Sequence, residues 1–116
     1  MNRSKKIGTA WETDIVRALK DGGWVNCERR TLSGAADRGD INVHPKVVIE
    51  AKNHGHLNLA AWVHEAEVER GNAGAEVAVV WCKRRGKAKA EDGYVVMTGD
   101  QFILLLEAAG YKWGVG

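Results

Sequence analysis

The chain has 116 residues, 45% hydrophobic and 28% charged, which is enough for one hydrophobic core but not for two. A single proline and the lack of a repetitive tract argue against a disordered chain. The longest apolar runs, residues 77–82 and 102–106, are too short to cross a bilayer, and the basic N-terminus leads into no signal sequence. We therefore expect one cytoplasmic domain over residues 1–116, with Cys27 and Cys82 as buried free thiols.

The formal net charge of +2 permits a nucleic-acid partner without requiring one. Arg29, Arg30 and Arg38 flank one segment, the basic residues of 83–89 form a second cluster, and acidic residues gather at 65–69. A charge distribution of this kind can produce a basic face on a nearly neutral protein.

Residues 9–20 are predicted to form a helix, because Trp11, Ile15 and the apolar residues after them recur at helical spacing. Thr9 and Glu12 have the spacing of a capping box, which gives Glu12 one structural interpretation. Two glycines, at positions 22 and 23, end this helix.

Three strands are expected next, over residues 24–28, 40–43 and 47–52. The segment 31–39 is rich in Ser, Gly, Ala and Asp and is predicted to be a loop. Only a short turn, residues 44–46, separates the second and third strands, so these two are predicted to form a hairpin.

A second helix is predicted over residues 59–70, with Asn58 as its N-cap and Trp62 on its apolar face. A strongly apolar strand over residues 76–82 follows, and a basic loop leads to a last strand over residues 94–97.

The final helix is predicted to begin near Asp100 and to direct Phe102, Leu105, Leu106 and Ala109 into the core. The element order is therefore αβββαββα, an α/β sandwich in which helices flank a central mixed sheet.

The predicted strand over residues 47–52 carries the main candidates for catalytic side chains. Side chains alternate along a strand, so Ile49 lies on an apolar face while Glu50 and Lys52 point to the other side. The hairpin brings Asp40 close to Glu50, and a divalent cation held by oxygen ligands, Mg²⁺ or Mn²⁺, is the usual remedy for two adjacent carboxylates. An ordinary ion pair of Lys52 with either acid is the alternative.

The ordered pattern Gly39-Asp40, nine residues, then Glu50-Ala51-Lys52 on an apolar strand resembles the signature of the PD-(D/E)XK nuclease superfamily. With Glu12 upstream and Ser33 in the loop, the chain is similar to archaeal and phage Holliday-junction resolvases over residues 8–110. This resemblance implies a restriction-endonuclease-like core. The chain departs from the family in one respect: related nucleases often carry a glutamine on the helix after the lysine, where this sequence has His64, Glu65 and Glu69.

The resemblance also implies roles for individual residues. Asp40 and Glu50 would hold the divalent metal, with the carbonyl of Ala51 as a further ligand. Lys52 would orient the attacking water and stabilise charge on the phosphate. Glu12 would be an additional ligand, directly or through a water, if it does not cap its own helix.

Several side chains are expected to contact DNA: Arg29, Arg30, Ser33, Arg38, Lys83, Arg84 and Arg85. Arg29 and Arg30 are explained equally well as side chains at a solvated strand end. Lys83, Arg84 and Arg85 would ordinarily be interpreted as part of a solvated loop. Asp37 is a rival to Asp40 as a ligand but is less well placed, because it lies in the loop before Gly39.

The leading interpretation is an Mg²⁺-dependent endodeoxyribonuclease, with Mn²⁺ as the alternative ion, that resolves four-way junctions by paired phosphodiester hydrolysis in recombination and repair. If a phage encodes it, the compartment would be the host cytoplasm. Two matched cuts imply a homodimer. The alternatives are a restriction-like or repair nuclease on the same core, a non-catalytic nucleic-acid-binding module, and a structural domain whose charges are ion pairs.

Overall fold

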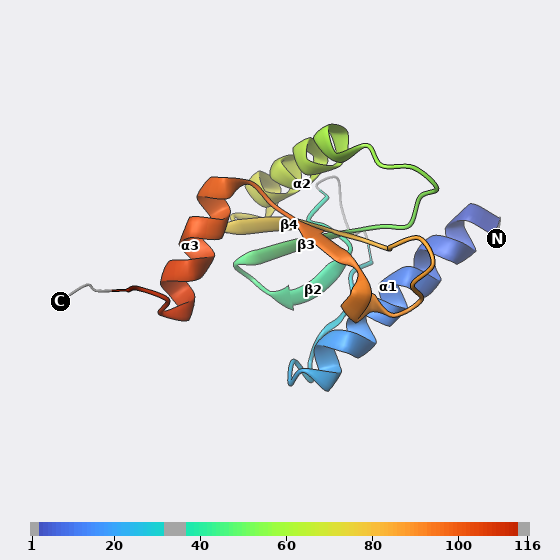
Figure 1. The fold of residues 1–116 in the computed structure, drawn as a ribbon, viewed down its shortest axis with the longest axis horizontal. Coiled ribbons are helices and arrows are strands. Elements are labelled where there is room, and N and C mark those ends of the chain that lie inside the picture. The colour runs from blue at the N-terminus through green and yellow to red at the C-terminus, as the bar shows by residue number, and fades with distance from the viewer. Residues whose placement is uncertain (1–2, 32–36, 114–116) are drawn as a thin grey trace.

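A computed structural model describes residues 3–31 and 37–113 of the chain (Figure 1). Its elements, in chain order, are α1 (Arg3–Asp21), β1 (Glu28–Arg29), β2 (Ile41–His44), β3 (Val47–Lys52), α2 (Leu59–Ala73), β4 (Val77–Cys82), the 3-10 turn η1 (Ala90–Asp92), β5 (Tyr94–Val96) and α3 (Gly99–Ala109). The predicted αβββαββα order is confirmed, with η1 added in the basic loop. No helix within the described ranges is both long and apolar enough to span a membrane.

The five strands form one sheet in the order β1-β2-β3-β4-β5. The central strands β3 and β4 run parallel, and every other neighbouring pair is antiparallel. Helices α1 and α2 cover opposite faces of this sheet (Figure 1). The prediction of a mixed sheet between helices, with a β2–β3 hairpin, is therefore confirmed.

Each face of the sheet has its own hydrophobic cluster. Trp11 and Ile15 of α1 pack on the side that includes Ile49, and Trp62 of α2 packs on the side that includes Val48. The alternation predicted for β3 is thus confirmed: its odd-numbered residues face α1, and its even-numbered residues face α2. Glu50 and Lys52, being even-numbered, lie between the sheet and α2.

The segment after α1 differs from the prediction of a strand over residues 24–28. Trp24 and Val25 are 54% and 70% exposed, and β1 consists of two residues only. The backbone N–H of Trp24 donates to the carbonyl of Leu19, and that of Cys27 donates to the carbonyl of Trp24, so turns continue from the helix end. Cys27 is nevertheless buried, and it and Cys82 are free thiols as predicted.

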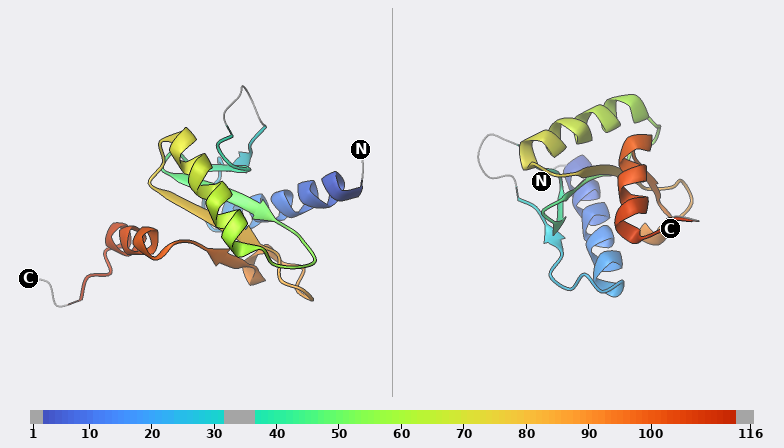
Figure 2. Two further views of the ribbon diagram at one scale, coloured as in Figure 1. Left: turned by 90° about the horizontal axis from the view of Figure 1, so that it is seen from above. Right: turned by 90° about the vertical axis from the view of Figure 1, so that its left-hand side faces the viewer.

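The last helix differs more strongly from its prediction. It forms where expected, but Phe102 and Leu105 are 48% and 43% exposed, so the expectation that its apolar side chains point into the core is wrong. Two views agree that α3 lies at one end of the molecule, away from the layers made by α1, α2 and the sheet (Figures 1 and 2). Its main contact with the body of the protein is made with β4, and Gln101 also donates to Glu67 on α2.

Candidate metal centre

The β2–β3 hairpin brings two acids together. The backbone N–H of Asp40, just before β2, donates to the carbonyl of Ile49 at 2.8 Å. The carboxylate Oδ2 of Asp40 accepts the backbone N–H of Ala51, also at 2.8 Å. These two bonds hold the Asp40 side chain beside the β3 position occupied by Glu50.

Gly39 makes this approach possible. Its φ of +94° lies in the left-handed region, and a Cβ at this position would lie 2.9 Å from Cγ1 of Val48 and 3.0 Å from the carbonyl of Ile49. Both the backbone conformation and the lack of space exclude ordinary side chains. A glycine before the acid thus lets the chain pass close to β3, which explains the Gly39-Asp40 pair.

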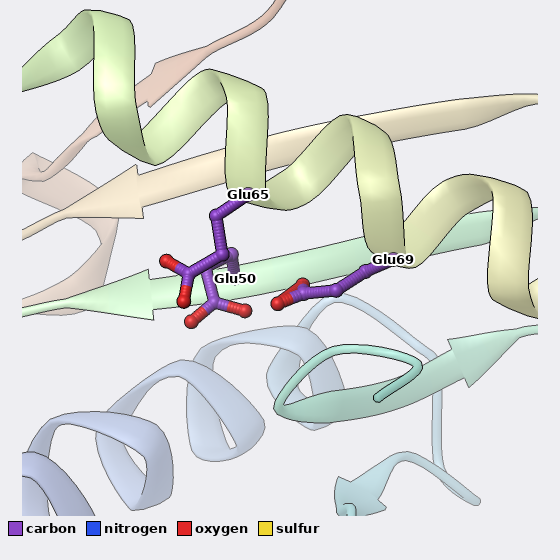
Figure 3. Close-up of side chains that lie close together, drawn as sticks. All are labelled: Glu50, Glu65 and Glu69. Atoms are coloured by element: carbon purple, nitrogen blue, oxygen red, sulfur yellow. The ribbon is translucent and has the colours of Figure 1, made fainter. Parts of the chain in front are cut away.

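Helix α2 contributes two further carboxylates that were not expected as site residues. Glu65 and Glu69 are four residues apart and therefore share one face of the helix. Figure 3 shows both side chains directed toward Glu50 on β3, and one carboxylate oxygen from each of the three lies within 4.8 Å of the others.

Two of these carboxylates are buried and have oxygens without hydrogen-bond partners. Glu69 is 1% exposed and Glu50 is 5% exposed. Within the described residues, both carboxylate oxygens of Glu69 and Oε2 of Glu50 lack a partner. A buried acceptor left unpaired costs free energy, and native proteins rarely tolerate several of them at one place. Oxygens of this kind suit a bound cation.

The electrostatics of the cluster agree with its geometry. Burial, and then the charge of Glu50, raise the pKa of Asp40 to about 8. Burial and the neighbouring Glu69 raise the pKa of Glu50 to about 9. Burial is also the main cause that raises the pKa of Glu69 to about 7, and charges such as that of Asp37 add to it. In the absence of a cation, the cluster therefore holds protons at neutral pH.

Lys52 lies in the same cluster. Its Nζ is 2.7 Å from Oε1 of Glu65 and 3.4 Å from Oε1 of Glu50. Burial acts to lower the pKa of Lys52, but the two carboxylates outweigh it and hold the pKa above its ordinary value. Lys52 is therefore a charged ammonium group among acids. This arrangement agrees with the catalytic role expected for Lys52 and also with the alternative of an ordinary ion pair.

Glu12 approaches the cluster from α1. Its Oε1 accepts Nε of Arg29 at 3.0 Å, which joins α1 to β1. Burial is the largest cause of the raised pKa of Asp40, and the charge of Glu12 also contributes to it. The capping-box interpretation of Glu12 is wrong, because α1 begins at Arg3 and both Thr9 and Glu12 lie inside the helix.

The basic residues named from the sequence occupy different environments. Arg29 is paired with Glu12, and Nη2 of Arg30 lies 3.5 Å from Oδ1 of Asn42, so both are engaged with the protein. Arg38 is exposed. Ser33 lies outside the described residues, and the carbonyl of Ala51 stays a prediction.

The loop after β4 carries the remaining basic residues. The backbone N–H of Lys83 donates to the carbonyl of Lys52 at 2.9 Å, so this loop starts beside the candidate site. Lys83, Arg84 and Arg85 line a groove with His54 and Gly55 from the loop that follows β3. The ends of two parallel strands thus place a positively charged groove directly beyond Lys52.

The carboxylate set fits a hard divalent cation. Its donors are all oxygens, which Mg²⁺ and Mn²⁺ prefer, whereas Zn²⁺ sites are usually completed by cysteine or histidine. Among the described residues, the only close cluster of such groups consists of Glu50, Glu65 and Glu69. The four-residue spacing of two acids on the helix after β3 is a sequence signal that could have identified these residues, although it is also common on solvated helices.

Comparisons of the chain with protein-family models, with curated proteins and with solved structures found no match. The chemistry of the site is therefore the ground for a proposal about function.

Proposed function

We propose that this chain is a divalent-cation-dependent DNA endonuclease with a restriction-endonuclease-like core, and that it resolves four-way DNA junctions. The observation that carries this proposal is the convergence of Asp40, Glu50 and Lys52 next to buried carboxylate oxygens that lack partners. The fold supports it, because the β2–β3 hairpin brings Asp40 beside Glu50, and Glu50 and Lys52 lie on the central strand β3, on the face that α2 covers.

Asp40, Glu50 and Glu69 would hold the cation, and the unpaired oxygens of Glu50 and Glu69 fit that role. When bound, Mg²⁺ or Mn²⁺ would supply a Lewis acid for the phosphodiester and lower the pKa of a water molecule. The ligands must be ionised to hold a cation, so its binding releases the protons that the raised pKa values keep on the acids.

Lys52 supplies the positive charge of the site. Its ammonium group would donate to the attacking water or to a phosphate oxygen, which stabilises the negative charge that develops as the bond breaks. Glu65 holds Lys52 at 2.7 Å and thereby positions it. The groove of Lys83, Arg84 and Arg85 would receive the phosphate backbone on the far side of Lys52.

Asp40→Asn is expected to abolish cleavage of a labelled synthetic four-way junction in Mg²⁺, by at least about 100-fold, because it removes a charged ligand. Wild type should introduce paired symmetric nicks and leave a linear duplex of the same sequence intact. Denaturing gels of both substrates measure this.

Each other outcome changes the proposal in a defined way. Cleavage of the linear duplex would keep a nuclease of the restriction or repair kind and discard junction resolution. Binding of DNA without cleavage in Mg²⁺ or Mn²⁺ would favour a non-catalytic binding module. An Asp40→Asn variant as active as wild type would remove the proposed site.

Glu69→Gln and Glu65→Gln form a matched pair that tests the contribution of α2. Glu69 is buried and unpaired, whereas the side chain of Glu65 is 45% exposed and occupied by Lys52. We expect Glu69→Gln to weaken Mg²⁺ binding by about 10–100-fold and Glu65→Gln to weaken it by less than about threefold. Titration calorimetry with Mg²⁺ alone measures both, and equal affinities in the two variants would contradict a ligand role for Glu69.

A further inference from the structure

The basic groove beside the candidate site also has an apolar part. The loop that follows β3 and the loop that follows β4 lie at the same end of the molecule (Figures 1 and 2) and line this groove. The polar part has a volume of about 340 Å³, and the adjoining apolar part, of about 320 Å³, adds His56, Leu57 and Tyr94 to the lining. Each part is in the size range of pockets that hold a small ligand.

Two side chains form a flat platform in the apolar part of the groove. Cζ of the Arg84 guanidinium lies 4.9 Å from the centre of the Tyr94 ring, and Nη1 of Arg84 donates to the carbonyl of Asp92 at 3.4 Å. Tyr94 is nevertheless 53% exposed, and Leu57, from the other loop, is 62% exposed. The platform is thus held in place by the protein and open to a ligand.

The positive charges of the groove are available to a ligand. Among the described residues, no acid forms an ion pair with Lys83, Arg84 or Arg85, whereas Arg17 and Arg29 are both paired with acids. Free cations beside exposed apolar side chains suit a ligand that combines phosphate groups with flat rings. A nucleotide has this chemistry.

The register of the sheet fixes the position of this platform relative to Lys52. Lys52 on β3 pairs with Cys82 on β4, which pairs with Tyr94 on β5. Side chains of such partners point to the same face of a sheet. Neighbouring strands are about 4.8 Å apart, so the Cα atoms of Lys52 and Tyr94 are separated by roughly 10 Å. A nucleotide next to a phosphate at Lys52 would therefore reach the platform.

We propose that this groove binds one unstacked base of a DNA strand, with the base against Arg84 and Tyr94 and the neighbouring phosphates in the polar part. A base inside a duplex has both faces covered by its neighbours, so only an unstacked base can reach the platform. Aromatic rings and Arg guanidinium planes are the usual stacking partners of such bases. The inference rests on the proposed action on DNA and gives it a substrate class: branched DNA with an unpaired nucleotide next to the scissile phosphate.

Fluorescence anisotropy in a chelator tests the groove without cleavage. The probes are a short labelled thymidine strand and an abasic strand of the same length, which has the same phosphates but no bases. Wild type should bind the thymidine strand at least about tenfold more tightly, because stacking on the platform adds to the phosphate contacts. Tyr94→Ala should reduce this preference to less than about threefold, whereas Tyr94→Phe keeps the ring and should retain the preference.

Tyr111→Ala is the matched control. Tyr111 is 78% exposed and follows α3, outside the groove, so this variant should keep the wild-type preference. Both tyrosines are exposed, so circular dichroism should show an unchanged fold in each variant. Equal binding of the two strands by wild type, an unchanged preference in Tyr94→Ala, or an equal loss in Tyr111→Ala would overturn the proposal. So would a weakened binding of fully paired duplex by Tyr94→Ala that matches its loss for the thymidine strand.

Cleavage in Mg²⁺, at DNA concentrations below saturation, tests the substrate class separately. Wild type should cut a junction with one unpaired thymidine at the branch point about tenfold faster than a fully paired junction, and Tyr94→Ala should cut both at similar rates. Equal rates in wild type would overturn this substrate class. Asp40→Asn should keep the strand preference in chelator. If neither junction is cut while that preference persists, the nuclease proposal fails and the base-binding groove is supported.

Discussion

Glu50→Gln is expected to slow Mg²⁺-dependent cleavage by about 10³-fold or more while the protein stays folded. Loss of one charged ligand removes several kcal/mol of stabilisation from the metal site, and each ~1.4 kcal/mol corresponds to a tenfold change in rate. The change keeps the shape of a side chain that is 5% exposed. It also removes the repulsion of Glu50 with Asp40 and Glu69, so stability without cation should equal or exceed that of wild type at pH 8.

Single-turnover cleavage and thermal unfolding in a chelator measure the two halves of this prediction. Glu76→Gln is the matched control, since Glu76 is an exposed acid paired only loosely with Lys46 at 3.8 Å. This control should cleave at the wild-type rate. Cleavage by Glu50→Gln within tenfold of wild type would mean that Glu50 is not a ligand. A large loss of stability would mean that its role is structural.

Without divalent cation, the protein is expected to lose stability as the pH rises from about 5 to about 9. The pKa values of Asp40, Glu50 and Glu69 are raised in the fold to about 8, 9 and 7, from ordinary values of 3.8, 4.5 and 4.5. The folded chain therefore keeps protons that the unfolded chain has already released. This contribution to stability is complete below about pH 4 and is lost as the pH rises through the folded pKa values.

The expected loss is several kcal/mol, or roughly 10 °C or more in the unfolding temperature of a domain of this size. Mg²⁺ should reverse the trend, since it binds the ionised carboxylates, so the rise in unfolding temperature on adding Mg²⁺ should be larger at pH 9 than at pH 6. Thermal unfolding in chelator and in Mg²⁺ across this range measures both effects. A wild-type profile in chelator that stays flat or rises, or one that matches that of Glu50→Gln, would contradict the coupling.

Local sequence patterns predicted the part of the site that lies on the hairpin. The period-two alternation of β3 placed Glu50 and Lys52 opposite Ile49, and the structure has that arrangement. The short turn of residues 44–46 made β2 and β3 neighbours, which brought Asp40 to Glu50. These relations span few residues, so backbone geometry and the hydrophobic pattern are enough to determine them.

Contacts between distant elements could not be predicted in this way. Glu69 is an acid on a polar helix in the sequence, and only the crossing of α2 over β3 buries it beside Glu50. The pairing of Glu12 with Arg29 likewise depends on where β1 lies against α1. A strand was predicted over residues 24–28, but β2 offers β1 only the pairs Glu28–Asn42 and Arg29–Ile41, so most of the predicted strand has no neighbour.

The sequence by itself determined the element order, the mixed sheet between helices, and the strand that carries Glu50 and Lys52 next to Asp40. The tertiary structure alone decided that two acids of α2 join that site and that α3 stands away from the core. The physical reason is that an apolar or acidic pattern defines a face of an element, while the neighbour that this face meets depends on the packing of the whole chain. For α3, the apolar pattern in the sequence is the same whether the helix packs in the core or lies outside it.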